Sequence, residues 1–166
     1  MIARSRPKGG SPTDASMGLI VVSGWVGFAI AFSVANSPRF ILQNGQKMWF
    51  AAGLALMLLG SRLRHHCFRV LGKYFTGDVK VVEGQRVIED GIYHWVRHPS
   101  YTGGIMMYVG TGLALTNWVS ALAMGISAPL GYAYRVRVEE RALRERLGDS
   151  YEQYMRRTTR FVPFLF

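Results

Sequence analysis

Cysteine is almost absent from this sequence of 166 residues, in which Cys67 is the only one. A single cysteine excludes an internal disulfide and any metal site built from several cysteines. His65 and His66 precede it directly, which suggests a zinc site, but adjacent residues on a helix point in different directions and do not easily converge on one ion. We therefore expect no metal site, and we interpret this stretch as the basic end of a helix.

Acidic residues are also scarce, since 10 Asp and Glu stand against 20 Lys and Arg, giving a formal net charge of +10. A soluble domain can carry such a charge when it binds nucleic acid. Here, however, the charges form blocks between long apolar runs and do not line the polar faces of amphipathic helices. This pattern predicts an integral membrane protein that has membrane lipids, and not nucleic acid, as partners, because basic blocks bind anionic headgroups.

The chain has the length of one domain and begins with a basic stretch rich in Gly, Pro and Ser. We expect residues 1–16 to form a disordered cytoplasmic tail and residues 17–166 to form a single membrane domain. A secretory signal also starts with positive charge. The apolar run that follows here is too long for the core of a signal, and no convincing small-residue cleavage site comes after it.

Four apolar runs predict an all-α integral membrane protein with about four transmembrane helices, a C-terminal helical hairpin and a cytoplasmic helical tail. The first run holds 19 residues without a charge, which is the length that crosses a bilayer. The second is short, and it spans the bilayer only if its helix continues through Leu63 while Arg62 and Arg64 reach to the interface. Asn117 marks a tight turn in the hairpin. The runs are residues 17–35, 48–60, 99–115 and 118–138.

The basic residues predict how these spans are oriented. Three Lys or Arg precede the first run, two separate the first from the second, seven separate the second from the third, and eight follow from Arg135 onward. Eighteen of the twenty therefore fall on one side of a four-span arrangement. Because the positive side of a membrane protein faces the cytoplasm, we predict that both termini are cytoplasmic. The polar residues 65–98 lie on the same side, with short extended pieces expected at 79–82 and 86–88.

A first candidate site precedes the third run. Pro99 suits the first turn of a helix, and its ring pushes His98 toward an extended conformation. Unpaired N–H groups at such a helix start can hold an anion such as a cofactor carboxylate, and Tyr93, His98 and Tyr101 add side-chain donors. The same residues are equally typical of an interfacial belt of aromatic and basic side chains, so that both interpretations stay open.

A second candidate site follows the fourth run. Arg135 and Glu139 are four residues apart and share one helix face with Tyr132. An arginine can hold a carboxylate or phosphate in a bidentate grip, and a glutamate nearby can bind the ammonium of an amino-acid-like cofactor. Taken alone, the pair favours the simpler interpretation of an ion pair on a solvated helix face.

The order of these residues along the second half of the chain is more informative than either site. It resembles the isoprenylcysteine carboxyl methyltransferase family, within a wider group that includes phospholipid N-methyltransferases, over roughly residues 70–163. The matching stretches are Gly91-x-Tyr93, Arg97-His98-Pro99-Ser100-Tyr101-x-Gly103, Arg135-x-x-x-Glu139-Glu140, Leu147-Gly148-x-x-Tyr151-x-x-Tyr154 and Thr159-Arg160-Phe161-Val162-Pro163.

The resemblance implies that the C-terminal helical hairpin and tail enclose S-adenosylmethionine. It implies that Arg135 faces the substrate and that Arg135 and Glu139 are the catalytic residues. Tyr132 shares the helix face of Arg135, and we therefore expect it to bind the substrate as well. The residues that it implies for cofactor binding are Gln85, Arg86, Val87, Ile88, Tyr93, His98, Pro99, Ser100, Tyr101 and Glu139.

We therefore expect an S-adenosylmethionine-dependent methyltransferase that acts at the cytoplasmic membrane face on a lipophilic or lipidated acceptor, above all a carboxylate of the isoprenylcysteine type. A carboxylate is ionised at neutral pH and needs no general base. A phospholipid amine, the alternative acceptor, must lose a proton, for which Glu139 or His98 is a candidate base. Two other classes stay open: a sterol-type reductase that uses NADPH, and a non-enzymatic scaffold that binds anionic lipid. No obligate protein partner is indicated.

Overall fold

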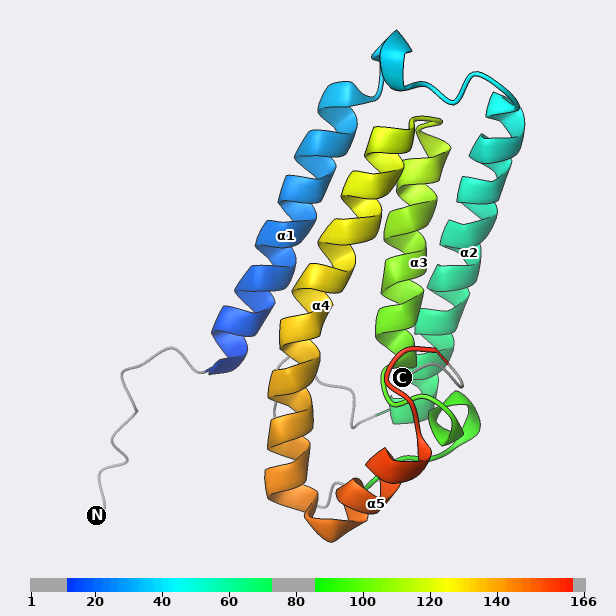
Figure 1. Cartoon of the computed structure of the whole chain (residues 1–166). Coiled ribbons are helices and arrows are strands. Elements are labelled where there is room, and N and C mark those ends of the chain that lie inside the picture. Colours follow the sequence, from blue (N-terminus) through cyan, green and yellow to red (C-terminus); the bar gives the residue numbers. More distant parts are fainter. Residues whose placement is uncertain (1–11, 73–85, 163–166) are drawn as a thin grey trace.

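The computed structural model describes residues 12–72 and 86–162. Successive long helices run in opposite directions (Figure 1). Within the described residues, β pairing is limited to two isolated bridges, so that the all-α prediction is confirmed for this part of the chain. The elements are α1 (Pro12–Val34), η1 (Pro38–Phe40), α2 (Gln46–Leu71), η3 (Gly91–His94), α3 (Pro99–Ala114), α4 (Trp118–Leu147) and α5 (Asp149–Arg157).

The hairpin of α3 and α4 is the centre of the bundle, with α1 packed on α4 and α2 packed on α3 (Figure 1). The connection from α1 to α2 crosses the hairpin turn at Asn117, the predicted turn residue. Asn117 Oδ1 accepts hydrogen bonds from the N–H groups of Val119 and Ser120, which begins α4. Its Nδ2 donates to the Val34 carbonyl at 2.8 Å, and one side chain therefore ties the end of α1 to the start of α4.

Glycines allow α2 and α3 to approach closely. A Cβ atom placed on Gly103 would lie 2.7 Å from the Gly60 carbonyl oxygen, and one placed on Gly110 would lie 2.7 Å from the Gly53 carbonyl oxygen. No real Cβ atom approaches backbone that closely, so each position requires glycine. Small residues of this kind are typical of contacts between membrane helices.

Two helix limits differ from the prediction. Helix α1 begins at Pro12, so that residues 12–16, predicted as part of a disordered tail, are helical. The reason is tertiary, since Ser16 is buried and accepts a hydrogen bond from Arg135 of α4; residues 1–11 lie outside the described residues. Helix α2 continues to Leu71, about two turns beyond the predicted limit, because its last turns are packed inside the protein, where Cys67 is fully buried.

The exposed outer face of α4 changes from apolar to basic side chains along the helix. Its exposed side chains are apolar at first and become basic after Tyr134, at a spacing of three or four residues that keeps them on one face. The opposite face carries the buried residues Tyr132, Arg135 and Glu140. The exposed face consists of Trp118, Leu122, Ile126, Leu130, Tyr134, Arg137, Arg141 and Arg144.

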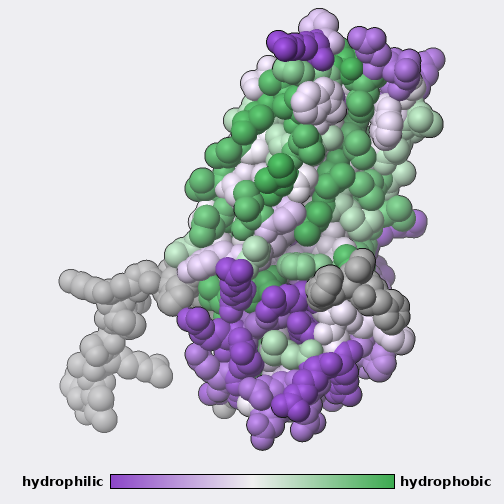
Figure 2. All heavy atoms as spheres, viewed as in Figure 1, coloured by the Kyte–Doolittle hydropathy of each residue, from purple (hydrophilic) through white to green (hydrophobic). Residues whose placement is uncertain are grey.

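Figure 2 shows the same change on one face of the molecule: hydrophobic residues cover the middle of the bundle, and hydrophilic residues lie at both ends, most of them at the end that carries α5. By length and composition, one helix among the described residues is apolar enough to cross a membrane, over Ala15–Val34 of α1. That α2, α3 and α4 also span the membrane, which would give four spans in all, stays a prediction.

Candidate active site

Most of the candidate site residues predicted from the sequence belong to one end of the bundle, where α3 begins and α4 continues beyond it (Figure 1). As predicted, Pro99 opens α3, and His98 is its N-cap residue. The chain after α5 lies beside this start: the N–H of Arg97 donates to the Thr159 carbonyl at 2.8 Å, and the N–H of His98 donates to the Arg160 carbonyl at 2.9 Å. The C-terminal tail therefore forms one wall of the site.

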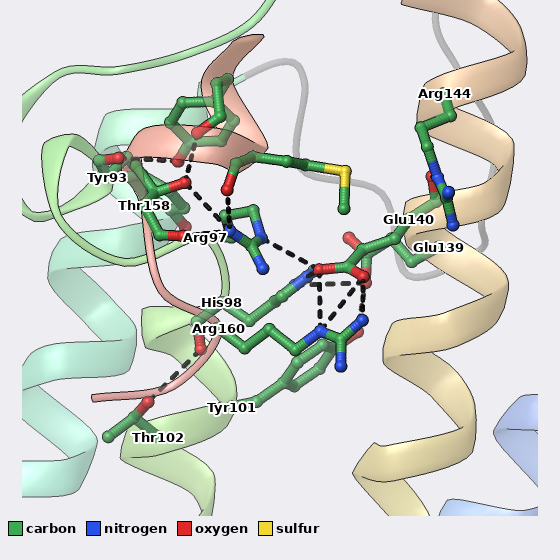
Figure 3. A network of polar contacts seen from close by, with 12 residues as sticks. Tyr93, Arg97, His98, Tyr101, Thr102, Glu139, Glu140, Arg144, Thr158 and Arg160 are labelled. Carbon is green, nitrogen blue, oxygen red and sulfur yellow. Dashed lines mark hydrogen bonds and ion pairs between the residues drawn. The ribbon is translucent and has the colours of Figure 1, made fainter. Parts of the chain in front are cut away.

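Glu140 connects these segments through a buried ionic cluster (Figure 3). Its Oε1 accepts a hydrogen bond from Arg97 Nε at 3.0 Å and lies 3.3 Å from His98 Nε2. Its Oε2 accepts from Arg160 Nη2 at 2.9 Å. The Glu140 side chain is 1% exposed, so that its charge is stabilised by protein partners and hardly by water. The cluster joins α4, the start of α3 and the tail.

The cations around Glu140 keep it ionised. Burial by itself raises the pKa of this carboxyl, but hydrogen bonds from His98, Arg160 and Arg97 outweigh burial and lower the pKa from 4.5 to about 2. Arg97 also donates to the carbonyls of Met155 and Thr158. With these donors engaged inside the protein, Arg97 and Glu140 serve to shape the site.

A column of three aromatic rings lies next to this cluster. His98 stacks on Tyr101 with 5.6 Å between ring centroids, and Tyr101 stacks on Tyr132 with 4.7 Å. The rings come from the N-cap of α3, its first turn and the middle of α4, so that the column fixes the two helices relative to each other.

Arg135 and Glu139 meet at the hydroxyl of Tyr101. Tyr101 donates a hydrogen bond to Glu139 Oε2 at 2.7 Å, and Arg135 lies close enough to the same hydroxyl to interact with it electrostatically. Arg135 is 4% exposed and donates to Ser16 of α1 at 2.9 Å, whereas the Glu139 side chain is 32% exposed. A buried guanidinium and an accessible carboxylate thus lie side by side, with His98 Nδ1 3.9 Å from Glu139.

Tyr93 anchors the loop before α3. Its carbonyl accepts a hydrogen bond from the Tyr154 hydroxyl at 2.6 Å, and its own hydroxyl is close enough to Cys67 of α2 to interact with it electrostatically. Burial raises the pKa of Tyr93, with a smaller contribution from the neighbouring Glu139 carboxylate. Tyr93 is therefore neutral at physiological pH and lies near both Cys67 of α2 and the Glu139 carboxylate.

The remaining residues predicted to bind the cofactor have fewer contacts with the site. Gln85 lies outside the described residues, and Arg86, Val87 and Ile88 have no regular secondary structure just before η3, with Arg86 exposed. The carbonyl of Ser100 accepts a hydrogen bond from Arg64 of α2.

Sequence reasoning missed Arg64, Arg97, Glu140 and Arg160 as residues of this site. Arg97, Glu140 and Arg160 stand within the stretches that carry the family resemblance, and their place in those stretches is the feature of the sequence that could have identified them as site residues. Arg64 was expected to extend to the membrane interface, and the structure turns it inward instead. No pattern along α2 distinguishes it from the exposed Arg62 two residues earlier.

A comparison with protein families gives a match over residues 53–145, to a family described as the isoprenylcysteine carboxyl methyltransferase family. Among similar proteins, a protein-S-isoprenylcysteine O-methyltransferase of Schizosaccharomyces pombe is 31% identical over 87% of this chain and 62% of its own. A protein-S-isoprenylcysteine O-methyltransferase B of Arabidopsis thaliana is 33% identical over 72% of this chain and 62% of its own.

Among solved structures, a eukaryotic intramembrane Ras methyltransferase, an isoprenylcysteine carboxyl methyltransferase, superposes with a TM-score of 0.70 at 26% identity. The superposition covers 95% of this chain and 55% of the other. The chain thus spans little more than half to about three fifths of the length of these relatives. The family match over residues 53–145 includes Arg135, Glu139 and Glu140 but not Arg160 of the tail.

Proposed function

The chain belongs to the isoprenylcysteine carboxyl methyltransferase family, and from this premise we propose that it transfers a methyl group from S-adenosylmethionine to the carboxylate of a lipophilic acceptor. The observation that carries the proposal is the arrangement of Arg135 and Glu139, one buried and one accessible, around the Tyr101 hydroxyl. The names of the relatives favour an isoprenylcysteine carboxylate as the acceptor.

The reaction needs positioning more than acid or base chemistry. A carboxylate oxygen of the acceptor forms a bond to the methyl carbon while the bond between that carbon and the sulfonium sulfur breaks, which yields a methyl ester and a neutral thioether. S-Adenosylmethionine supplies the activated methyl group. No proton is transferred because the acceptor is already ionised. The residues of the chain therefore have to align the acceptor with the methyl group and exclude water.

The described residues have the chemistry that both molecules need. The Arg135 guanidinium, with Ser16 and Tyr101 beside it, can hold and orient a carboxylate. The Glu139 carboxylate, partly open to solvent, suits the ammonium of a methionine group. The half-buried Tyr101 ring, held between His98 and Tyr132, places its hydroxyl against that carboxylate.

An apolar groove offers a place for the lipid part of the acceptor. It measures about 330 Å³ and begins at Ile20, one turn along α1 from Ser16, which itself contacts Arg135. Its lining is apolar and aromatic, so that a lipid chain in the groove would have its polar end directed toward Arg135. The lining residues are Ile20, Val21, Gly24, Trp25, Phe28 and Tyr108.

We further propose that the bundle is embedded in a membrane, with the site on the cytoplasmic side. Many apolar side chains of α1 are exposed, among them Val22 at 60% and Trp25 at 72%. The outer face of α4 becomes basic after Tyr134, as expected where a helix leaves the apolar layer. Arg135 and Glu139 then lie at headgroup depth, where the carboxylate of a membrane-held acceptor would meet a soluble cofactor.

The decisive experiment is transfer of a radiolabelled methyl group by the purified protein in detergent or lipid nanodiscs. Farnesylcysteine and phosphatidylethanolamine are compared as acceptors. We expect label on farnesylcysteine that alkali releases as methanol, because a methyl ester is hydrolysed by base. We also expect calorimetry to detect binding of S-adenosylmethionine but not of NADPH. Label on the amine alone would support N-methylation, and saturable binding of NADPH alone would contradict methyl transfer.

Variants test the site within the same assay. Arg135→Ala and Glu139→Ala are expected to abolish transfer, while the folded fraction is monitored by size-exclusion chromatography. Arg137→Ala is the matched control, because Arg137 lies on the exposed outer face of the same helix. Full activity in both site variants would overturn the assignment.

A further inference from the structure

Arg64 of α2 reaches into the site from a helix that sequence reasoning left out of it. Its Nη1 donates a hydrogen bond to the Ser100 carbonyl at 3.1 Å, in the first turn of α3. The same guanidinium lies beside the Tyr132 hydroxyl on α4, because both groups border one glycine of α3, Gly104. One side chain thus contacts both helices of the central hairpin.

Two glycines of α3 provide the space that this side chain occupies. A Cβ atom on Gly103 would lie 2.8 Å from Arg64 Cγ. A Cβ atom on Gly104 would lie 2.4 Å from the Tyr132 hydroxyl oxygen and 3.1 Å from Arg64 Nη1. A residue larger than glycine at position 104 would therefore displace the contact between Arg64 and Tyr132.

The inward orientation of Arg64 needs a physical reason. An arginine near the end of a membrane helix ordinarily extends its charged group to the water interface, and burying that group is unfavourable unless hydrogen bonds compensate. Arg62, on the same helix, is exposed. Arg64 is half-buried, the Ser100 carbonyl accepts a hydrogen bond from its guanidinium, and the Phe68 ring lies 5.3 Å from the guanidinium carbon.

These contacts connect Arg64 to the proposed cofactor residues. The ring of Tyr132 stacks on Tyr101, whose hydroxyl donates to Glu139. The position of the Tyr132 ring therefore affects how Tyr101 is placed toward Glu139.

We propose that Arg64 is a positioning residue of the active site, which holds the Tyr132 hydroxyl through the gap at Gly103 and Gly104 and thereby orients Tyr101 and Glu139 for the cofactor. This inference rests on the proposed function. Arg64 acts through Tyr132, so that the cofactor affinity depends on both residues as one unit.

The test is a double-mutant cycle between Arg64 and Tyr132, with the affinity for S-adenosylmethionine measured by calorimetry and the KM and kcat of methyl transfer measured in nanodiscs. Arg64→Met is expected to weaken cofactor affinity about tenfold, the effect of one hydrogen bond to a charged group, with a smaller change in kcat. Tyr132→Phe should have a similar effect, and the double variant should be no weaker than either single variant.

Further variants separate positioning from a purely structural role. Arg64→Lys retains a cationic donor and should recover part of the affinity, whereas Gly104→Ala should reproduce the effect of Arg64→Met. Arg62→Met is the matched control on the same helix and should leave KM unchanged. Gly110→Ala disturbs the packing of α2 on α3 at Gly53 without touching Arg64, and should lower the melting temperature without changing the affinity of the folded protein.

The outcomes also separate this inference from the function on which it rests. If the unchanged protein does not bind S-adenosylmethionine, the proposed function fails. If it binds the cofactor and Arg64→Met binds it equally well, or if the effects of Arg64→Met and Tyr132→Phe simply add, the positioning role is wrong while the function stands. If Arg64→Met does not fold, Gly104→Ala and Arg64→Lys give the same readouts.

Discussion

Glu139 and Glu140 are neighbours in the chain with different surroundings. Consecutive residues on a helix point in different directions, so that Glu140 faces Arg97 and Arg160 while Glu139 faces Tyr101. The Glu140 side chain is 1% exposed and that of Glu139 is 32% exposed. We infer that Glu140 holds the tail against α3, and that Glu139 is the residue free to meet a ligand.

At the residue scale, Glu140→Gln is expected to lower stability at neutral pH by about 3–5 kcal/mol, because removing one member of a buried ionic cluster leaves its partners without compensation. The pKa of Glu140 falls from 4.5 to about 2 on folding. A carboxyl with a lowered pKa stabilises the folded state above its unfolded pKa, and this contribution is lost as the pH falls toward the folded pKa.

The difference in stability between the unchanged protein and Glu140→Gln should therefore be constant above about pH 5 and shrink as the pH falls from 4.5 toward 2. Denaturation in detergent at a series of pH values measures it. A difference that is the same at pH 3 and pH 7 would contradict the ionic role of Glu140.

At the scale of elements, the hairpin turn does more than reverse the chain. Asn117 is fully buried and binds α1 as well as α4. Asn117→Ala should lower stability by about 1–3 kcal/mol, because the Val34 carbonyl and the N–H groups at the start of α4 lose a buried partner.

Thermal unfolding in detergent measures this loss, with Asn44→Ala as the control, since Asn44 is exposed in the same connecting region. Equal melting temperatures for the two variants would mean that the turn does not hold α1.

At the scale of the whole molecule, the arrangement of helices places the 36–45 connection at one end of the bundle and α5 at the other (Figure 1). The positive-inside rule predicts that α5 faces the cytoplasm. Single cysteines introduced as Gln43→Cys and Gln153→Cys, both at exposed positions, in a chain with Cys67→Ala report the orientation.

A membrane-impermeant maleimide added to intact cells should label the cysteine at position 43 and should label the one at position 153 only after the cells are opened. The reverse pattern would place the candidate site outside the cytoplasm. Labelling of both positions in intact cells would show that the bundle does not separate two compartments.

The features that depend on a single helix or turn could be predicted from the sequence. The apolar runs predicted where four long helices lie, the His98-Pro99 step predicted the start of α3, and Asn117 predicted the hairpin turn. The spacing of Arg135 and Glu139 placed both on one helix face. Each of these follows from backbone geometry and side-chain periodicity, which act over a few neighbouring residues.

Which helix covers each face could be seen only in the folded structure. It placed Ser16 of α1 against Arg135, Arg64 of α2 against Tyr132, and the tail against Glu140. Periodicity along one helix specifies a face but not the neighbour that packs on it, because that choice depends on the shapes of two separate segments, such as the glycine gap at positions 103 and 104. For this reason Arg64 and Arg62 look alike in the sequence, while one lies in the site and the other is exposed.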